Sequence, residues 1–327
     1  MKAKKPILII LGEPNSVFVE LISKVISNKL LKQINRPIIL IGSENLLNAQ
    51  LKVLKRKLLY KKIEKNELDN KLQKKIYLIN VNYNFKKAFE KISYKSRRYI
   101  SNCFFEALKL LNTKQSNIII NGPISKKYFL RNKFPGITEY IHAKSKKRKS
   151  NRPVMLIFNK SLSVSPISTH IPLKYVYKKI NIKNIVSNVM IINSFYTRLL
   201  KIKPKIALLG LNPHCETKLK YNEEIKIIKP AIKKLRRKKI NVTGPYSADT
   251  FFLKHNLKKY NSVVGMYHDQ VLTPFKTLYN FDASNITLGL PFIRLSVDHG
   301  PNENMLGKNK SDTKSLKNIF NFIVSIK

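Results

Sequence analysis

Short apolar runs that end at polar or turn-forming residues alternate with longer stretches of helical periodicity, and this alternation constrains the fold more than any other feature of the chain. The apolar runs, five or six residues each, cover 7–11, 37–41, 76–81, 117–121, 154–158, 162–167, 205–210 and 262–267. The helical stretches lie near 17–30, 97–112, 182–202 and 222–239. Such alternation is typical of βαβ units. It predicts an α/β fold with a mainly parallel sheet.

The length of the chain indicates two domains. At 327 residues it exceeds the size at which a single hydrophobic core usually stops growing, and 43% of the residues are hydrophobic, which is ample for buried cores. No internal repeat or Pro/Ser-rich linker is visible. The Lys-rich stretch 51–75 is expected to form a solvated helix.

The formal net charge of +46 raises the question of a polyanionic partner. Lysines are spread over almost every segment, and the densest runs, 144–150 and 233–239, contain no aromatic residues of the kind that stack on bases. Solvated lysine-rich faces therefore explain the charge better than a dedicated nucleic-acid site. No nucleic acid is expected as a partner, and a basic nucleic-acid-binding protein stays as a remote alternative.

Cysteine content and hydropathy bear on the compartment. Cys103 and Cys215 are too few and too far apart for a disulfide framework or a thiolate zinc site, which favours a reducing compartment and a cytoplasmic protein. The first apolar run is shorter than the core of a signal peptide. No apolar run approaches the roughly 20 residues needed to cross a bilayer, so no membrane partner is expected.

Polar residues follow several predicted strands, and three of these strand ends carry a histidine. The histidines are His170, His214 and His268. Ligands of open α/β sheets bind at the carboxyl ends of strands, so these side chains are expected to converge. Three neutral imidazoles can hold a catalytic divalent ion, although one histidine at a strand end is more often a hydrogen-bonded structural residue. The chain contains neither G-x-G-x-x-G nor G-x-x-x-x-G-K-[ST], which removes the standard dinucleotide and phosphate-loop fingerprints.

Five longer motifs are more specific than the single histidines. They are STHIPL, GLNPHCE, GPYSADTFF, MYHDQVLTPFKTL and NITLGLPFIRLSVDHG, which occur in this order between residues 168 and 300. In order and spacing they resemble the family of 4-hydroxythreonine-4-phosphate dehydrogenases, which are NAD-dependent enzymes of pyridoxal phosphate biosynthesis. The resemblance is strongest over residues 117–300.

The resemblance implies a two-domain α/β/α fold like that of isocitrate and isopropylmalate dehydrogenases, which bind NAD without the Rossmann glycine fingerprint. Residues 1–135 together with 281–327 are then expected to form the first domain, and residues 136–280 the second. The second domain is expected to carry most metal-site residues and the dimer interface, because enzymes of this family are homodimers whose active site is completed across the subunits. The sequence does not identify the residues that contact NAD.

The metal site is also implied by the resemblance. The positions of His170, His214 and His268 match the family's metal ligands, the third coming from the partner subunit. Imidazole ligands accept Zn and Co, and oxygen donors from the substrate would suit Mg and Mn, so all four ions stay open. Asp269 is a candidate to orient an imidazole. Asp249 is a candidate for proton transfer or for a carboxylate near the metal, and its alternative role is to cap the helix that begins nearby.

Four positions match the family's substrate contacts: Thr138, Lys276, Asn285 and Arg294. A small phosphorylated amino acid needs cations and hydrogen-bond donors. The guanidinium of Arg294 suits a forked contact with an anionic oxygen, whereas Lys276 supplies a point charge. The substrate implied is 4-phosphohydroxy-L-threonine, which is oxidised and decarboxylated to 3-amino-2-oxopropyl phosphate.

Several binding-loop positions depart from the family. The family carries a histidine before the threonine of its GHTE segment, where it contacts the substrate phosphate; Ile137 stands here and cannot donate a hydrogen bond. The first loop, GEPNSVFVE at 12–20, lacks the family's glycines, and the last loop, GPNENMLGKNKSD at 300–312, also differs. A dehydrogenase for another 4-phosphorylated hydroxy acid, 4-phosphoerythronate or 4-phosphothreonate, is therefore the nearest alternative.

Overall fold

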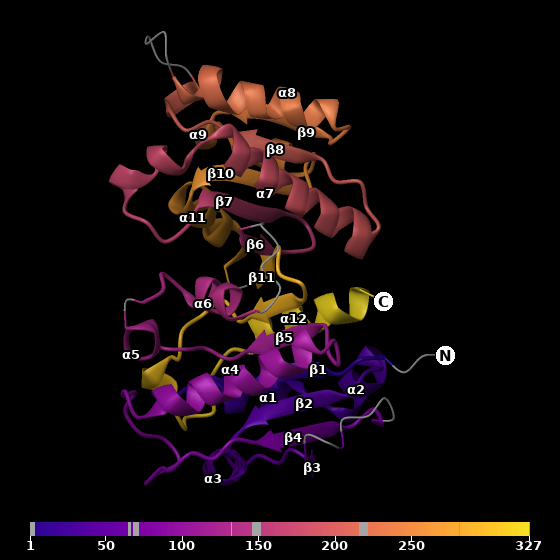
Figure 1. Ribbon diagram of the computed structural model, residues 1–327, viewed down its shortest axis with the longest axis vertical. Coiled ribbons are helices and arrows are strands. Elements are labelled where there is room, and N and C mark those ends of the chain that lie inside the picture. The colour runs from indigo at the N-terminus through magenta and orange to yellow at the C-terminus, as the bar shows by residue number, and fades with distance from the viewer. Residues whose placement is uncertain are drawn as a thin grey trace. The chain divides into compact units, whose positions relative to one another are not determined.

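The computed structural model describes residues 4–64, 67, 72–131, 133–145, 152–215, 222–280 and 282–326. The chain divides into two compact units, which are residues 1–149 with 290–325 (unit 1) and residues 150–289 (unit 2) (Figure 1). The basic run 144–150 lies outside the described residues from position 146 onward. The domain ranges expected from the sequence, with boundaries at 135/136 and 280/281, stay a prediction.

Unit 1 is built on a parallel sheet with the strand order β3, β4, β2, β1, β5, β12. Its strands are β1 (Ile7–Ile10), β2 (Ile38–Gly42), β3 (Lys61–Lys62), β4 (Ile76–Asn80), β5 (Ile118–Asn121) and β12 (Ile293–Ser296). Its helices are α1 (Phe18–Val25), α2 (Asn28–Ile34), α3 (Glu44–Val53), α4 (Ser96–Asn112), α5 (Lys126–Leu130), α6 (Ile137–Lys144) and α12 (Lys314–Ser325). Helix α4 packs against β1 and β2, and α12 packs against α1, α2 and β12. Strands β1 and β2 are fully buried, as continuous apolar runs in a parallel sheet are.

Unit 2 has the strand order β11, β6, β7, β10, β8, β9. Its strands are β6 (Val154–Phe158), β7 (Ser163–Ser168), β8 (Ile206–Leu209), β9 (Val242–Tyr246), β10 (Ser262–Tyr267) and β11 (Ser284–Leu288). Strand β6 runs antiparallel to both neighbours, and the other pairs are parallel. Its helices are α7 (Ile182–Phe195), α8 (Lys229–Arg237), α9 (Ala248–Phe251), α10 (Lys254–Leu257) and α11 (His268–Tyr279). No helix in the described parts of either unit is long and apolar enough to cross a membrane.

The α/β fold and the mainly parallel sheet expected from the sequence are confirmed. Each of the predicted strands is present, with ends that differ by at most one residue from those expected. The solvated helix expected over 51–75 is wrong for the described part of that stretch, because α3 ends at Val53 and the next element is the strand β3; positions 65, 66 and 68–71 lie outside the described residues. Lys55, two residues after Val53, has a positive φ of 52°, which a right-handed helix cannot accommodate.

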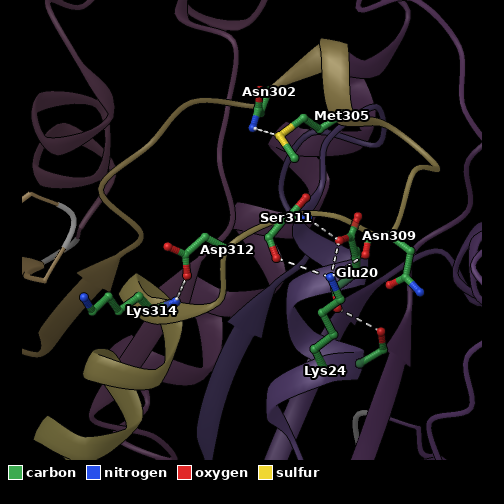
Figure 2. A network of polar contacts seen from close by, with 9 residues as sticks. Glu20, Lys24, Asn302, Met305, Asn309, Ser311, Asp312 and Lys314 are labelled. Atoms are coloured by element: carbon green, nitrogen blue, oxygen red, sulfur yellow. Dashed lines mark hydrogen bonds and ion pairs between the residues drawn. The ribbon is translucent and has the colours of Figure 1, made fainter.

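A buried ion pair fastens the last loop of the chain to α1 (Figure 2). Lys24 Nζ lies 2.6 Å from Glu20 Oε1, and only 1% of the Glu20 side chain is exposed. Lys24 Nζ also donates hydrogen bonds to the backbone oxygens of Asn309 (2.9 Å) and Ser311 (3.3 Å). The backbone N–H of Ser311 donates to the same oxygen of Glu20 at 2.7 Å. Charge-assisted hydrogen bonds therefore hold residues 309–311 against α1.

Breaking this pair is expected to destabilise unit 1. Lys24→Met leaves the Glu20 carboxylate buried without its cation, and we expect the free energy of unfolding to fall by about 3 kcal/mol. Urea unfolding measures this loss. The control is Lys32→Met, which removes an exposed lysine of α2. Adding Glu20→Gln to Lys24→Met is expected to restore part of the loss, because the uncompensated charge is then removed. Equal unfolding midpoints for Lys24→Met and Lys32→Met would contradict a stabilising role for the pair.

Candidate functional site

Three neighbouring strands of unit 2 present the histidines that the sequence analysis grouped. Strands β7, β10 and β8 are adjacent and parallel, and Tyr267 of β10 pairs with Ser168 of β7. His170 stands two residues after β7, His268 directly after β10, and His214 five residues after β8. Carboxyl ends of parallel strands meet at one edge of a sheet. The order of the strands therefore brings the three segments to the same edge of unit 2.

His170 and His268 lie side by side. Their ring centroids are 5.7 Å apart. His268 Nδ1 is 2.6 Å from Oδ1 of Asp269, and 33% of the His268 side chain is exposed. A carboxylate on Nδ1 favours the tautomer with its proton there, which leaves Nε2 with a lone pair for a metal ion. The geometry suits the orienting role suggested for Asp269.

His214 is paired with the other candidate carboxylate. Its Nδ1 lies 3.5 Å from Oδ2 of Asp249. Oδ1 of Asp249 accepts hydrogen bonds from the Ser247 hydroxyl and, at 2.8 Å, from the backbone N–H of Thr250. The Ser247 hydroxyl, this backbone N–H and His214 hold the pKa of Asp249 below its ordinary value, so the carboxylate is ionised at neutral pH. The alternative role of Asp249 as a helix N-cap is wrong, because Ser247 occupies that position and Asp249 lies within α9.

A buried carboxylate fixes the loop that presents His214. Glu224 Oε1 accepts hydrogen bonds from the backbone N–H groups of Leu211 (2.7 Å) and Asn212 (2.9 Å). Burial alone would raise the pKa of Glu224, but the hydrogen bonds that Asn212 and Leu211 donate lower it. No sequence motif marks Glu224, because it lies thirteen residues after Leu211 in a stretch of helical periodicity.

Gln270 ties the ends of two of the three strands together. Its Nε2 donates to the backbone oxygen of Gly210 at 2.7 Å, and its Oε1 accepts from the backbone N–H of Met266 at 2.7 Å. Met266 belongs to β10, and Gly210 directly follows β8. Gln270 therefore fixes the spacing between the segments that carry His268 and His214. Its place in the YHDQ motif was the available signal, but the sequence analysis gave it no role.

The histidines at this edge of unit 2 are donors that suit a divalent metal ion. Among the described residues, no group of three or more His, Cys, Asp or Glu side chains is placed to hold a metal ion. One chain brings together the imidazoles of His170 and His268, while His214 is paired with Asp249. Neutral imidazoles are ligands of Zn and of other divalent transition metals.

Unit 1 contains a buried arginine next to another expected substrate contact. Arg294, in β12, is 4% exposed. Its Nε donates to Oδ1 of Asn121 at 2.8 Å, and its Nη1 donates to the Thr138 hydroxyl at 3.1 Å. Burial lowers the pKa of Arg294 to about 10, and Glu139 raises it, so the guanidinium is charged at neutral pH. Asn121, at the end of β5, was not singled out from the sequence.

The other expected substrate positions differ in their surroundings. Ile137 is 8% exposed and belongs to an apolar cluster with Phe104 and Phe129, so it serves the core of unit 1. Lys276 lies in α11 of unit 2, and burial lowers its pKa. Asn285 lies in β11 of unit 2, beside Ile157 of β6. Thr138 and Arg294 thus come from unit 1, whereas Lys276 and Asn285 come from unit 2.

Glu13, in the loop after β1, is an unusual buried acid that the sequence analysis did not single out. It is 1% exposed, and its Oε2 accepts a hydrogen bond from the Ser96 hydroxyl at 3.2 Å. No described residue hydrogen-bonds to its Oε1. Burial raises the pKa of Glu13 to about 7, against the opposing effect of hydrogen bonds from Ser96 and Asn15, and the charge of Glu303 raises it further.

This acid is expected to make stability depend on pH. The pKa is about 7 in the folded chain and 4.5 in the reference state, so between these values the folded chain binds more protons and its stability falls as pH rises. From about pH 5 to about pH 8 the loss is about 2 to 3 kcal/mol. Urea unfolding of Glu13→Gln, which does not ionise, should lack this loss. The control is Glu64→Gln at an exposed position. If the free energy of unfolding depended on pH in the same way in Glu13→Gln and Glu64→Gln, this would contradict the assignment of the pH dependence to Glu13.

Comparisons with known proteins find relatives that match over most of the chain. A model of the family described as pyridoxal phosphate biosynthetic protein PdxA matches residues 33–323. The chain is 38% identical over 314 residues to 4-hydroxythreonine-4-phosphate dehydrogenase of Sulfurihydrogenibium sp. (strain YO3AOP1). The aligned residues cover 94% of each chain. It is 30% identical over 322 residues to D-threonate 4-phosphate dehydrogenase of Salmonella typhimurium. The aligned residues cover 95% of this chain and 96% of the relative. The crystal structure of 4-hydroxythreonine-4-phosphate dehydrogenase from Klebsiella pneumoniae superposes with a TM-score of 0.79 at 26% identity, over 98% of this chain and 100% of the other.

Proposed function

We propose that this chain, which belongs to the family of the pyridoxal phosphate biosynthetic protein PdxA and is an oxidoreductase, oxidises and decarboxylates 4-phosphohydroxy-L-threonine with NAD as the hydride acceptor. The pairing of His170 with His268 at the ends of two adjacent parallel strands carries this proposal. Two imidazoles in contact, one of them oriented by Asp269, provide part of a metal site where a substrate hydroxyl can be activated.

The reaction removes hydride from C3 of the substrate and a proton from its C3 hydroxyl. NAD takes the hydride, and the 3-keto acid that results loses carbon dioxide to give 3-amino-2-oxopropyl phosphate. A divalent ion held by His170, His214 and His268 would supply Lewis-acid polarisation of the substrate oxygen. Zn, Mg, Co and Mn all stay open as the metal.

The residues of the chain itself divide into binding and proton-handling groups. Arg294 and Thr138 in unit 1 bind an anionic group of the substrate, since their side chains are already hydrogen-bonded to each other and held in place by Asn121. Lys276 and Asn285 are proposed as further substrate contacts from unit 2.

Asp249 is proposed as the proton acceptor for the substrate hydroxyl. The hydrogen bonds that keep its pKa low also keep it ionised at neutral pH, and its Oδ2 faces Nδ1 of His214.

We further propose a cytoplasmic homodimer in which the second subunit contributes the third metal ligand. The support is that, among the described residues, the rings of His170 and His268 lie 5.7 Å apart whereas His214 is paired with Asp249, so His214 rather than His268 is the ligand that a second subunit would supply. A shared site of this kind makes activity depend on assembly, since a separate subunit has an incomplete ligand set.

A second candidate substrate is a 4-phosphorylated hydroxy acid without an amino group. Two observations favour it: Ile137 occupies the position of a phosphate-binding histidine, and the chain is 30% identical to a D-threonate 4-phosphate dehydrogenase over almost its full length. We still prefer 4-phosphohydroxy-L-threonine as the substrate, because the relative that is 38% identical over 94% of the chain is a 4-hydroxythreonine-4-phosphate dehydrogenase.

Substrate comparison tests the proposal. Formation of NADH is measured for 4-phosphohydroxy-L-threonine, 4-phosphothreonate and 4-phosphoerythronate with the same dimeric protein and the same metal. We expect the highest kcat/KM for the threonine compound. A higher kcat/KM for either hydroxy acid would replace the proposed substrate, and the absence of NADH with all three would overturn the proposed function.

A further inference from the structure

His214 holds a backbone conformation that a residue with a side chain rarely adopts. Its φ is 55° and its ψ is 10°, and the residue that follows, Cys215, has a φ of 59°. Both lie in the left-handed region, where the Cβ atom crowds the following carbonyl oxygen. Such residues persist where the surrounding structure holds them in place. The groups that hold this loop therefore decide where the His214 imidazole stands.

The contacts of the His214 side chain itself are too weak to hold the loop. The side chain is 75% exposed, and the distance of 3.5 Å from its Nδ1 to Oδ2 of Asp249 is longer than a firm hydrogen bond. The backbone of the loop, rather than a contact of the imidazole, therefore sets the place of His214.

Glu224 holds the backbone directly before His214. It is fully buried, with 0% exposed, and it begins a π-helical turn, Glu224–Ile228, of a kind that is frequent at functional sites. Its Oε1 accepts the backbone N–H groups of Leu211 (2.7 Å) and Asn212 (2.9 Å), and its Oε2 accepts the side-chain amide of Asn212 at 2.9 Å. Hydrogen bonds to a carboxylate are stronger than those between neutral groups. One carboxylate thus fixes two consecutive residues of the loop.

We infer that Glu224 is a positioning residue, which holds His214 where it binds the divalent ion of the proposed site. This inference rests on the proposed function, because that function supplies the ion. Glu224 acts through the loop, since its carboxylate contacts the residues two and three positions before His214. A ligand that is already in place loses less freedom on binding than one that the ion must order, so the affinity for the ion is higher.

Glu224→Gln tests this role with little change of shape. The new amide meets the amide of Asn212, so two donors face each other where a donor now faces an acceptor. We expect the Kd of Co²⁺ to rise about 10- to 100-fold, measured from the visible absorption of Co²⁺ added to metal-stripped full-length protein. The control is Glu223→Gln, because this neighbouring acid accepts the side-chain amide of Asn212 at 2.9 Å and can still do so as an amide. Equal Kd values for the two variants would overturn the inference.

A double-mutant cycle separates positioning from a general loss of structure. If Glu224 acts through His214, Glu224→Gln weakens Co²⁺ binding in the unaltered chain but changes the Kd less than about twofold in a His214→Ala background. If Glu224→Gln merely loosens unit 2, the Kd rises by the same factor in both backgrounds. Equal factors would therefore contradict a positioning role.

A measurement on the unaltered protein covers the case in which Glu224→Gln does not fold. Hydrogen exchange reports whether the backbone amides of Leu211 and Asn212 are protected before any ion is present. We expect slow exchange of both amides in metal-stripped protein, and the same rates after Co²⁺ is added. Unprotected amides that become protected only with Co²⁺ would show that the ion, not Glu224, orders the loop.

Failure of the inference and failure of the proposed function give different results. NADH formation from 4-phosphohydroxy-L-threonine together with an unchanged Kd of Co²⁺ in Glu224→Gln would remove the inference alone. A raised Kd in that variant, without NADH formation by the unaltered protein, would remove the proposed function alone. The absence of Co²⁺ binding by the unaltered protein would remove both.

Discussion

His268→Ala is expected to lower metal-dependent kcat/KM by about 10³-fold or more. The side chain stands at the end of β10, in contact with the imidazole of His170 and with its Nδ1 held by Asp269. Loss of a metal ligand removes Lewis-acid stabilisation worth several kcal/mol, and about 1.4 kcal/mol corresponds to a tenfold change in rate. The fold should survive, because 33% of this side chain is exposed.

A matched control and a milder variant make this result specific. His255→Ala removes an exposed histidine of α10 in the same unit and should keep full activity. Asp269→Asn keeps the shape of the partner on Nδ1 but not its charge, and we expect a loss of about 10- to 100-fold together with weaker metal binding. NADH formation and metal content are the measurements. Activity of His268→Ala at the level of His255→Ala would remove His268 from the metal site.

Arg294→Lys is expected to raise the KM for the phosphorylated substrate by about 100-fold or more. Arg294 is 4% exposed and is hydrogen-bonded to Asn121 and Thr138. Lysine keeps the positive charge but cannot make the forked contacts of a guanidinium, and the loss of a buried charged contact typically costs about 2 to 5 kcal/mol. Steady-state kinetics with varied substrate measure this change.

The control for Arg294→Lys is another arginine of unit 1. Arg36 donates to the side-chain oxygen of Asn117, so Arg36→Lys makes a comparable change at a second arginine–asparagine contact. We expect Arg36→Lys to have the same KM as the unaltered protein. Thermal unfolding of both variants separates loss of binding from loss of stability. An unchanged KM in folded Arg294→Lys would exclude Arg294 as a substrate contact.

The strands were predictable from the sequence where burial on both faces makes them continuous apolar runs. Strand β1 is such a run, and its expected and observed ends nearly coincide. Strands β3, β9, β11 and β12 were not predicted, because polar residues, glycine or proline make up or interrupt each of them and none is a continuous apolar run. Helix α11 was also not predicted, because it begins directly after β10 and contains Pro274.

The sequence indicated which residue types form the candidate site, but it did not indicate the hydrogen bonds that hold their loops in place. The position of a histidine directly after a strand indicates where its side chain lies, since the edge of a parallel sheet is shared. The hydrogen bonds of Glu224 and Gln270 that fix the loops join residues whose proximity arises only on folding. The same holds for the buried carboxyls of Glu13 and Glu139, which depend on burial rather than on any local motif.

Ile137 shows how a family resemblance and the structure of one chain complement each other. The motif alone marks the position as a departure from a phosphate-binding histidine. The structure gives the reason that an isoleucine is accommodated there, since the side chain is buried in an apolar cluster with Phe104 and Phe129. We propose that the groups around Arg294 then bind the phosphate, which the kinetics of Arg294→Lys test.

The most direct test of the central claim is the stoichiometry of NADH and carbon dioxide released from 4-phosphohydroxy-L-threonine by metal-stripped protein, before and after a divalent ion is added. The account predicts no turnover without metal and, after addition, equal amounts of NADH and carbon dioxide. Full turnover by the stripped protein, or NADH formed without carbon dioxide, would contradict it.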